Sequence, residues 1–346
     1  MPGMRANHLR SLALVLMLPM LGTSHGRTYL GDYSGHDAAD RVVTIRAGEA
    51  AVRFVSFGED VLRVDFLPAA GTRIDSSLAV VADTLNAPAY AVTETDSTLR
   101  LSVGTLVVTC SKRPLRFSFE AGGLPILAEP HGGGLSTEGS ERAATFSLAP
   151  DDHFYGTGER GTSLDKRGQR LTCYNVHEGG YTWPVSTMSV NVPFIASPRG
   201  YGLFFDTSFP GQFDLGSTDP ARFWYETDGG ELSFFVMAGH SIPDLLEVFT
   251  RLTGRQPLPP LWAFGYIQSK YGYRDEMEVR DAARLMREKR IPCDAFVLDL
   301  YWFRHMGDLT WNTAAWPNPF TLMRDLEADG FKTIAITEPY IVEYSP

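Results

Sequence analysis

Short apolar runs recur through residues 29–238, and in several of them apolar and polar side chains alternate. The segment 115–119, Leu-Arg-Phe-Ser-Phe, shows the period of two that is typical of a half-buried strand. Glycine-rich turns such as 122–123 and 132–134 separate the runs. Many short strands with such turns predict a β-sandwich. The clearest expected strands are 42–45, 52–57, 61–66, 99–103, 106–109, 115–119, 201–206 and 232–237.

A short helix is expected where this β region ends. Ser241 suits the N-cap, Pro243 suits the first turn, and Asp244 forms a weak capping box with Ser241. A broad apolar face follows, and Gly254 suits the position just after the helix. The next segment, 255–260, contains three prolines, which cannot continue a helix or hold a central strand. We therefore predict a β-sandwich domain over 27–254, a linker over 255–260 and a second domain over 261–346.

Strands and helices alternate after the linker. Mostly apolar runs at 261–268, 295–299 and 332–338 predict strands, and helices are expected at 275–290 and 319–329. Near-continuous apolar strands joined by helices indicate a parallel sheet. The carboxyl ends of such strands meet at one edge, where α/β folds carry their sites. The sequence thus predicts a β domain followed by an α/β domain.

The N-terminus has the features of a secretory signal peptide. Arg5 and Arg10 precede an apolar run at 12–21, which is too short to span a bilayer, and small and polar residues follow at 22–26. This order favours a signal peptide over a membrane anchor. We expect residues 1–26 to be removed, the protein to be exported to the periplasm or outside the cell, and no stable membrane insertion.

Charge and composition narrow the classes of partner. The net charge is −10, and an acidic surface repels phosphate backbones, so nucleic acid is not expected. Aromatic residues reach 12%, which suits either carbohydrate binding or a β-rich core. Cys110, Cys173 and Cys293 leave at least one thiol unpaired, and we expect Cys110 and Cys293 to be buried and inert. Neither a metal-ligand spacing nor a cofactor motif occurs.

Motifs on both sides of the linker form a specific combination. After the linker they are Pro259-Pro-Leu-Trp-Ala-Phe-Gly-Tyr266, Ser269-Lys-Tyr-Gly-Tyr-Arg274, Ile291-Pro-Cys-Asp-Ala-Phe-Val-Leu-Asp299, Met306-Gly-Asp-Leu-Thr-Trp311, Trp316-Pro317 and Gly330-Phe-Lys332. Before it they are Phe154-Tyr-Gly-Thr-Gly-Glu159, Val192-Pro-Phe194 and Arg199-Gly-Tyr-Gly202. Together they resemble glycoside hydrolase family 31, closely over about 150–346 and loosely over 30–150.

The resemblance implies a galactose-mutarotase-like β-sandwich followed by the first three strands of a catalytic (β/α)8 barrel. Family members cleave or transfer α-linked glycosyl groups with retention, using two aspartates on barrel strands after the third. A complete barrel takes roughly 250 residues, many more than follow Pro260. No residue of this chain matches either catalytic aspartate. We therefore expect the nucleophile and the acid/base beyond Pro346, and we expect no cofactor, because two carboxylates suffice for the chemistry.

The resemblance also implies part of a substrate-binding wall. Asp299 matches an aspartate that binds sugar hydroxyls in the −1 subsite, a task that suits an ionised carboxylate; a capping or salt-bridged aspartate is the alternative. Tyr271 matches an aromatic that lines the same subsite, with a core tyrosine as the alternative. Leu300 and Ile341 match apolar residues beside the sugar, with plain packing as the alternative. Glu338 follows the third strand, where a turn beside a proline explains it equally well.

Two departures from the family pattern stand out. Many members carry Asn-x-Asp in a loop that reaches the active site; here Asn175 fits and is expected to contact substrate, but His177 replaces the aspartate. Either Glu178 substitutes or the contact is lost, and we assign no role to His177. After the second strand the chain has Asp-Leu-Tyr-Trp-Phe instead of Asp-Ile-Asp, similar to the branch with oligosaccharide 4-α-glucosyltransferases. We hypothesise that Tyr301 and Trp302 form an acceptor-sugar platform that favours transfer over hydrolysis.

Two functions compete at this point. The first is an exported retaining glycoside hydrolase or transglycosidase acting on α-linked glucosides such as α-1,4-glucan oligosaccharides. The second is a non-catalytic carbohydrate-binding β-sandwich protein, or a remnant of the enzyme. Because three strands cannot close a barrel, we expect the 346-residue chain alone to be inactive and aggregation-prone. Linkage preference, glucose versus xylose at the −1 subsite, and oligomeric state stay open.

Overall fold

The computed structural model describes residues 26–69, 77–176, 180–337 and 343. The chain divides into two compact units, one ending at Arg255 and the other beginning at Gln256, and each is considered separately below. This division falls inside the predicted proline-rich linker. The predicted signal peptide lies almost entirely outside the described residues. In the described ranges, no helix is long and apolar enough to cross a membrane.

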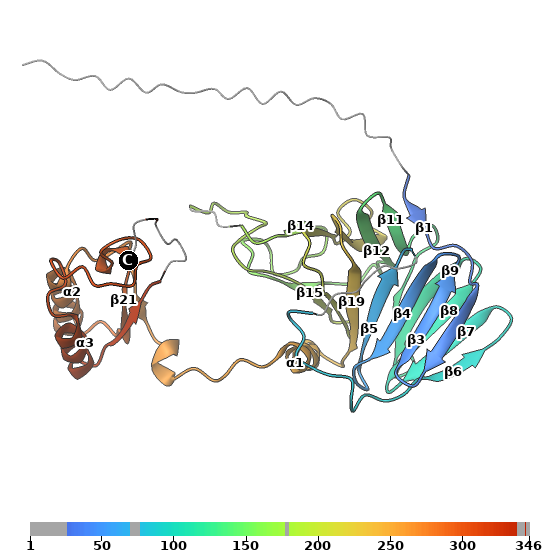
Figure 1. The fold of residues 1–346 in the computed structure, drawn as a ribbon, viewed down its shortest axis with the longest axis horizontal. Helices are drawn as coiled ribbons and strands as arrows, with labels where there is room; N and C mark the ends of the chain where they lie inside the picture. The colour runs from blue at the N-terminus through green and yellow to red at the C-terminus, as the bar shows by residue number, and fades with distance from the viewer. Residues whose placement is uncertain (1–25, 70–76, 177–179, 338–342, 344–346) are drawn as a thin grey trace, which may run out of the picture. The chain divides into compact units, whose positions relative to one another are not determined.

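The first unit consists of antiparallel sheets, as the alternating pattern predicted (Figure 1). In the described residues an eight-stranded sheet has the order β13 (Tyr155–Gly158), β15 (Asn191–Ser197), β16 (Tyr201–Phe205), β19 (Leu232–Ala238), β5 (Val61–Leu67), β4 (Ala50–Ser56), β3 (Val42–Ala47), β2 (Gly35–Ala39). A five-stranded sheet has the order β10 (Leu124–Ala128), β9 (Leu115–Ala121), β8 (Leu106–Lys112), β7 (Thr98–Val103), β6 (Ala91–Glu94). The remaining described strands form a sheet in the order β1 (Thr28–Tyr29), β11 (Leu135–Glu138), β12 (Glu141–Ser147), β18 (Arg222–Thr227), β17 (Gly211–Asp214), β14 (Arg170–Cys173).

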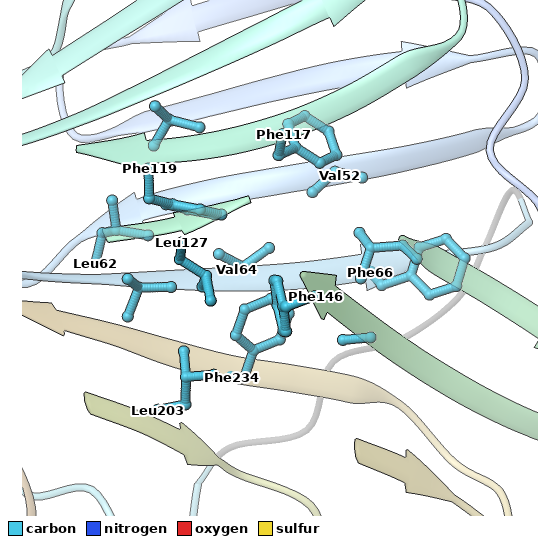
Figure 2. Packing of buried hydrophobic residues seen from close by; sticks show 14 of the residues in the cluster. Val52, Leu62, Val64, Phe66, Phe117, Phe119, Leu127, Phe146, Leu203 and Phe234 are labelled. Carbon is cyan, nitrogen blue, oxygen red and sulfur yellow. The ribbon is translucent and has the colours of Figure 1, made fainter. Parts of the chain in front are cut away.

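One hydrophobic core joins the eight-stranded sheet to the other two sheets (Figure 2). Phe54 of β4 meets Phe117 of β9 edge-on, with ring centroids 5.2 Å apart. Phe146 of β12 meets Phe234 of β19 in the same way at 6.0 Å. Strands β3 and β9 alternate between buried and partly exposed residues because only one of their faces meets this core. The predicted β-sandwich is therefore confirmed.

Strand β19 is buried on both faces, as is its neighbour β16. Its outer face carries Phe235 and Met237, which pack against Leu245 and Val248 of helix α1 (Ile242–Thr253). A strand covered on both sides needs a continuous apolar run, which the sequence of β19 largely provides. Helix α1 thus extends the core to the outer side of the eight-stranded sheet (Figure 1).

The start of α1 differs slightly from the expected capping box. The Ser241 side chain caps the helix by accepting a hydrogen bond from the Asp244 backbone N–H at 3.3 Å. The Asp244 carboxylate, however, accepts from the backbone N–H of His240 at 3.0 Å instead of that of Ser241. The reciprocal bond has therefore moved one residue outward. Gly254 follows the helix with φ +92°, as predicted.

Glu129 links the two smaller sheets through its carboxylate. One oxygen accepts from the Phe117 N–H of β9 at 2.9 Å, and the other accepts from the Leu135 N–H of β11 at 3.0 Å. Burial raises the pKa of Glu129 to about 8, although both N–H donors favour the ionised form. All three cysteines are free and buried, which confirms the expectation for Cys110 and Cys293.

The second unit contains a parallel sheet with helical connections, as predicted. In the described residues its strands have the order β20 (Ile267–Gln268), β21 (Ala295–Leu298), β22 (Lys332–Ala335), and all pairs are parallel. The helices are α2 (Glu276–Glu288) and α3 (Pro319–Ala328), with short 3-10 turns η1 (Leu261–Phe264) and η2 (Leu300–Trp302). Both helices pack against one face of β21 through a cluster that includes Phe296, Leu298 and Trp316.

The predicted strand over 261–268 is mostly wrong. Residues 261–264 form η1, at whose start the Ala263 N–H donates to the Pro260 carbonyl at 2.9 Å. Only Ile267–Gln268 pairs as a strand. A short apolar run without periodicity does not distinguish a strand from a helical turn. The strand predicted over 295–299 ends one residue early, because Asp299 is the N-cap of η2.

Candidate substrate-binding site

Asp299 lies at the carboxyl end of β21 and is half-buried. One carboxylate oxygen accepts the Leu300 N–H at 2.7 Å, so the capping alternative holds for that oxygen. Asp299 forms no ion pair with any described residue. The second oxygen therefore keeps its full capacity to accept hydrogen bonds from ligand hydroxyls. The two roles, capping and binding, are compatible in one carboxylate.

Two buried indoles hold the turn that follows Asp299. Trp302 donates from Nε1 to the Ile336 carbonyl at 3.0 Å, and Trp316 donates from Nε1 to the Tyr301 carbonyl at 2.9 Å. Trp302 is only 5% exposed. The hypothesis that Trp302 forms an acceptor platform is therefore wrong, because its ring belongs to the core of the second unit. Its role is to fix the position of η2.

The exposed aromatic surface near this edge comes from two tyrosines instead. Tyr271 is 78% exposed and Tyr301 is 43% exposed, and their rings meet edge-on with centroids 6.3 Å apart. Gly272 has φ +64°, and a Cβ there would lie 1.9 Å from the Tyr301 ring. A glycine is therefore needed for this approach. The alternative that Tyr271 is a core residue is wrong.

The remaining residues predicted for this edge have different outcomes. Leu300 is half-buried and packs against the core cluster of the second unit, so packing accounts for much of its surface. Ile341 and Glu338 lie outside the described residues. Asp299, Leu300 and Tyr301 follow one strand consecutively, and Tyr271 follows the neighbouring strand β20. The structure thus brings Asp299 and Tyr271 to the same edge of the sheet.

Asn175 belongs to the first unit, where it holds a loop in place. Its Oδ1 accepts from the Asn191 backbone N–H at 2.7 Å and from Asn191 Nδ2 at 3.1 Å. Its carbonyl oxygen is thus already used, and only its amide nitrogen stays available to a ligand. Asn175 also lines a cavity of about 310 Å³. His177 and Glu178 lie outside the described residues.

A larger cavity of about 560 Å³ lies against α1 in the first unit. Its lining is strongly charged and includes an ion pair between Asp60 and Arg251 at 2.5 Å. None of the predicted substrate-binding residues lines it. In the part of the chain that the structure describes, no group of three or more His, Cys, Asp or Glu side chains is arranged to hold a metal ion.

The chain has a β-sandwich followed by parallel β/α units, with an acid and exposed tyrosines at the strand ends. This order is typical of modular proteins in which a β domain precedes a (β/α)8 barrel. Residues 51–214 match the glycosyl hydrolase 31 N-terminal galactose mutarotase-like domain, and residues 256–346 match the glycosyl hydrolases family 31 TIM-barrel domain. The chain belongs to glycosyl hydrolase family 31. The resemblance inferred from the motifs is thereby confirmed.

Individual relatives agree with this assignment. The chain is 31% identical to alpha-glucosidase 2 of Bacillus thermoamyloliquefaciens over 322 residues, covering 92% of this chain and 41% of the relative. It is 32% identical to alpha-xylosidase XylQ of Lactiplantibacillus pentosus over 208 residues, covering 58% of this chain and 26% of the relative. The chain therefore spans about two fifths of the first relative and a quarter of the second.

Solved structures show the same fold. A GH31 dextranase from Flavobacterium johnsoniae, complexed with isomaltotriose, superposes with a TM-score of 0.86 at 24% identity, covering 91% of this chain and 39% of the dextranase. A GH31 alpha-xylosidase from a soil metagenome, complexed with xylose, superposes with a TM-score of 0.73 at 19% identity, covering 87% and 47% of the two chains.

Sequence reasoning missed several residues that the structure brings together. Asn191 anchors Asn175, and Tyr174, Phe209 and Tyr225 line the same cavity. These residues come from separate segments of the chain, so no local pattern groups them. One signal was available in the sequence: Phe209 lies in Ser-Phe-Pro-Gly, and Pro-Gly indicates a turn, so an exposed position for this ring could have been expected.

Proposed function

We propose that this chain supplies the N-terminal domain and the first barrel strands of a retaining glycosidase or transglycosidase that acts on α-linked glucosides. The observation that carries the proposal is Asp299, a carboxylate at the carboxyl edge of the parallel sheet beside exposed tyrosines. One of its oxygens has no hydrogen-bond partner among the residues that the structure describes. Membership of glycosyl hydrolase family 31 and relatives named as alpha-glucosidases and alpha-xylosidases support the reaction class.

Each residue has a distinct role in this proposal. Asp299 accepts hydrogen bonds from sugar hydroxyls, and Tyr271 covers one side of the same −1 sugar. Leu300 and Ile341 provide apolar contacts beside it. Asn175 positions its loop through Asn191 and contacts substrate with its amide nitrogen. The nucleophile and the acid/base come from residues after Pro346, where retention requires two carboxyl groups about 5–5.5 Å apart.

The preference for transfer over hydrolysis is assigned to Tyr301. With Trp302 buried, Tyr301 is the exposed aromatic that follows Asp299 and can stack on an acceptor sugar. Bound acceptor excludes water from the glycosyl-enzyme intermediate and so favours transglycosylation. In the complete gene product, Tyr301→Ala lowers the ratio of transfer products to glucose on maltotriose; an unchanged ratio contradicts the assignment.

The central test compares Asp299→Asn with wild type in the complete gene product on 4-nitrophenyl α-glucoside. Loss of charge-assisted bonds to two hydroxyls lowers kcat/KM by roughly 100-fold. Asp281→Asn is the matched control, because Asp281 lies on α2 in an exposed ion pair with Arg284. A kcat/KM for Asp299→Asn within twofold of wild type contradicts the proposal. We expect the 346-residue chain alone to show no turnover.

A second candidate function is carbohydrate binding without chemistry, which the uncharged cavity of the first unit favours. Saturable sugar binding without turnover in the complete gene product would support it over the enzyme. Export is also part of the proposal, because residues 1–26 have the order of a signal peptide. N-terminal sequencing of the protein from its natural source tests this, and a retained Met1 contradicts it.

A further inference from the structure

The cavity of about 310 Å³ in the first unit has an uncharged lining. It lies between the end of β14, the start of β15 and the loop that connects β16 to β17. Its volume is at the lower end of the range for ligand pockets, about 300–1,000 Å³, which suits one or two sugar rings. Since no Arg, Lys or His lines it among the described residues, it offers no partner for a phosphate or carboxylate.

Two partly exposed aromatic side chains line this cavity. Tyr174 is 57% exposed and Phe209 is 47% exposed. Phe209 packs on Gly229 and Gly230, and a Cβ on Gly230 would lie 2.4 Å from its ring. The glycines therefore fix the place of the ring without covering it completely. Flat, fixed aromatic faces suit the apolar C–H faces of a pyranose ring.

Tyr225 brings a hydroxyl group to the cavity from inside the core. The residue is only 1% exposed, and its ring stacks on Phe205 with centroids 4.2 Å apart. Its hydroxyl oxygen lies beside Gly211, where a Cβ would approach it to 2.2 Å. This hydroxyl makes no hydrogen bond with any described residue. Burial raises the pKa of Tyr225 well above its usual value, so the group stays neutral.

Asn191 supplies a second polar atom that has no partner among the described residues. Its Nδ2 donates to the carbonyls of Tyr174 at 2.8 Å and Met188 at 2.9 Å, which fixes the orientation of the amide. Its Oδ1 is buried and accepts no hydrogen bond within the described residues. A buried polar atom without a partner is destabilising. A hydroxyl-bearing ligand relieves this cost at Asn191, and the Tyr225 hydroxyl offers it a second polar contact.

We propose that this cavity binds a neutral sugar unit of an α-linked oligosaccharide, with Tyr174 and Phe209 against the ring and the Tyr225 hydroxyl and Asn191 Oδ1 bonded to its hydroxyls. The choice of an α-linked sugar rests on the proposed function; the choice of a neutral polyol rests on the lining alone. The cavity holds the ligand by stacking and neutral hydrogen bonds, so binding is insensitive to salt.

The test is calorimetric titration of the full chain, carried as a fusion to a soluble protein without sugar affinity, with maltose and isomaltose. Tyr225→Phe removes one hydroxyl and keeps the ring, and it weakens binding about five- to tenfold. Phe209→Ala removes an aromatic wall and weakens binding at least about tenfold. Phe320→Ala, at an exposed position on α3, is the matched control and leaves affinity unchanged. Thermal melting confirms that each variant is folded.

Asp299→Asn separates this proposal from the proposed function. Binding that Tyr225→Phe and Phe209→Ala weaken supports the cavity, whether or not Asp299→Asn also weakens it. Binding that only Asp299→Asn weakens overturns the cavity and leaves the proposed function intact. Neutral sugar sites of this kind are weak but measurable, with a Kd of about 1 mM. If the folded fusion shows no binding at a sugar concentration about 20-fold above this Kd, the cavity proposal is also overturned.

Discussion

Replacing Asp65 by asparagine tests the packing of the first unit most sharply. Asp65 lies on β5 and is fully buried; its neighbours across the sheet are Arg53 on β4 and Ser233 on β19. Arg53 Nη2 lies 2.6 Å from Oδ2, Arg63 Nε lies 2.6 Å from Oδ1, and the Ser233 hydroxyl donates at 2.8 Å. Both carboxylate oxygens are therefore saturated by charge-assisted or neutral hydrogen bonds.

The expected loss follows from this geometry. Asp65→Asn keeps the shape but removes the charge, and its amide group turns a donor toward a guanidinium. Because Arg63 is largely buried, it keeps a poorly compensated charge; Asp206 lies 3.8 Å from its Nη1. Removing one partner of a buried pair costs about 3–5 kcal/mol.

Urea unfolding followed by tryptophan fluorescence measures this loss in the full chain. Asp37→Asn is the control, because Asp37 and Arg46 form an ion pair at the surface, where solvent screens the interaction. We expect no resolvable change for that variant. A loss below about 1 kcal/mol for Asp65→Asn would mean that the buried carboxylate is not the partner of both arginines.

Three further changes give distinct outcomes. A side chain at a positive φ costs about 1–2 kcal/mol, and Gly122→Ala, with open space around it, shows this cost alone. Gly272→Ala lowers the free energy of unfolding by more than this, because its Cβ meets the Tyr301 ring. Equal losses for the two variants in urea unfolding contradict this prediction. Trp302→Ala destabilises the chain by about 3–5 kcal/mol, and unchanged melting contradicts its burial. Burial raises the pKa of Glu129 to about 8 from 4.5, so the folded state keeps a proton that the unfolded state releases. The free energy of unfolding therefore falls by up to about 4 kcal/mol between pH 5 and 8. Glu129→Gln removes this decline, and parallel pH profiles of wild type and variant contradict the prediction.

The β-sandwich was predictable because many of its strands carry their own signal, although others, such as β2 and β13, show neither alternation nor an apolar run. Alternation marks strands with one face in the core, such as β9, and a continuous apolar run marks β19, which α1 covers on its outer face. Charged residues and prolines likewise predict where helices begin and end. Asp275, for example, caps α2 by accepting the Glu278 N–H at 2.9 Å. Local chemistry decides these features, so a single sequence contains them.

The site was predictable only where motifs carry it. Asp299 and Tyr271 follow neighbouring parallel strands, so topology places them at one edge. The burial of Trp302 was not predictable, because an aromatic residue after a strand suits a platform and a core equally, and its bond to Ile336 depends on tertiary contact. The grouping of Tyr174 with Phe209 required the folded sheets.

In the proposed function, this chain belongs to an enzyme that cleaves α-glucosides with retention and uses Asp299 to hold the sugar. Proton NMR of the first products released by the complete gene product from 4-nitrophenyl α-glucoside tests it most directly. We predict that α-glucose appears first and that β-glucose follows only through spontaneous mutarotation, with the release of α-glucose strongly slowed in Asp299→Asn. Initial release of β-glucose, or an undiminished rate in Asp299→Asn, contradicts the proposed function.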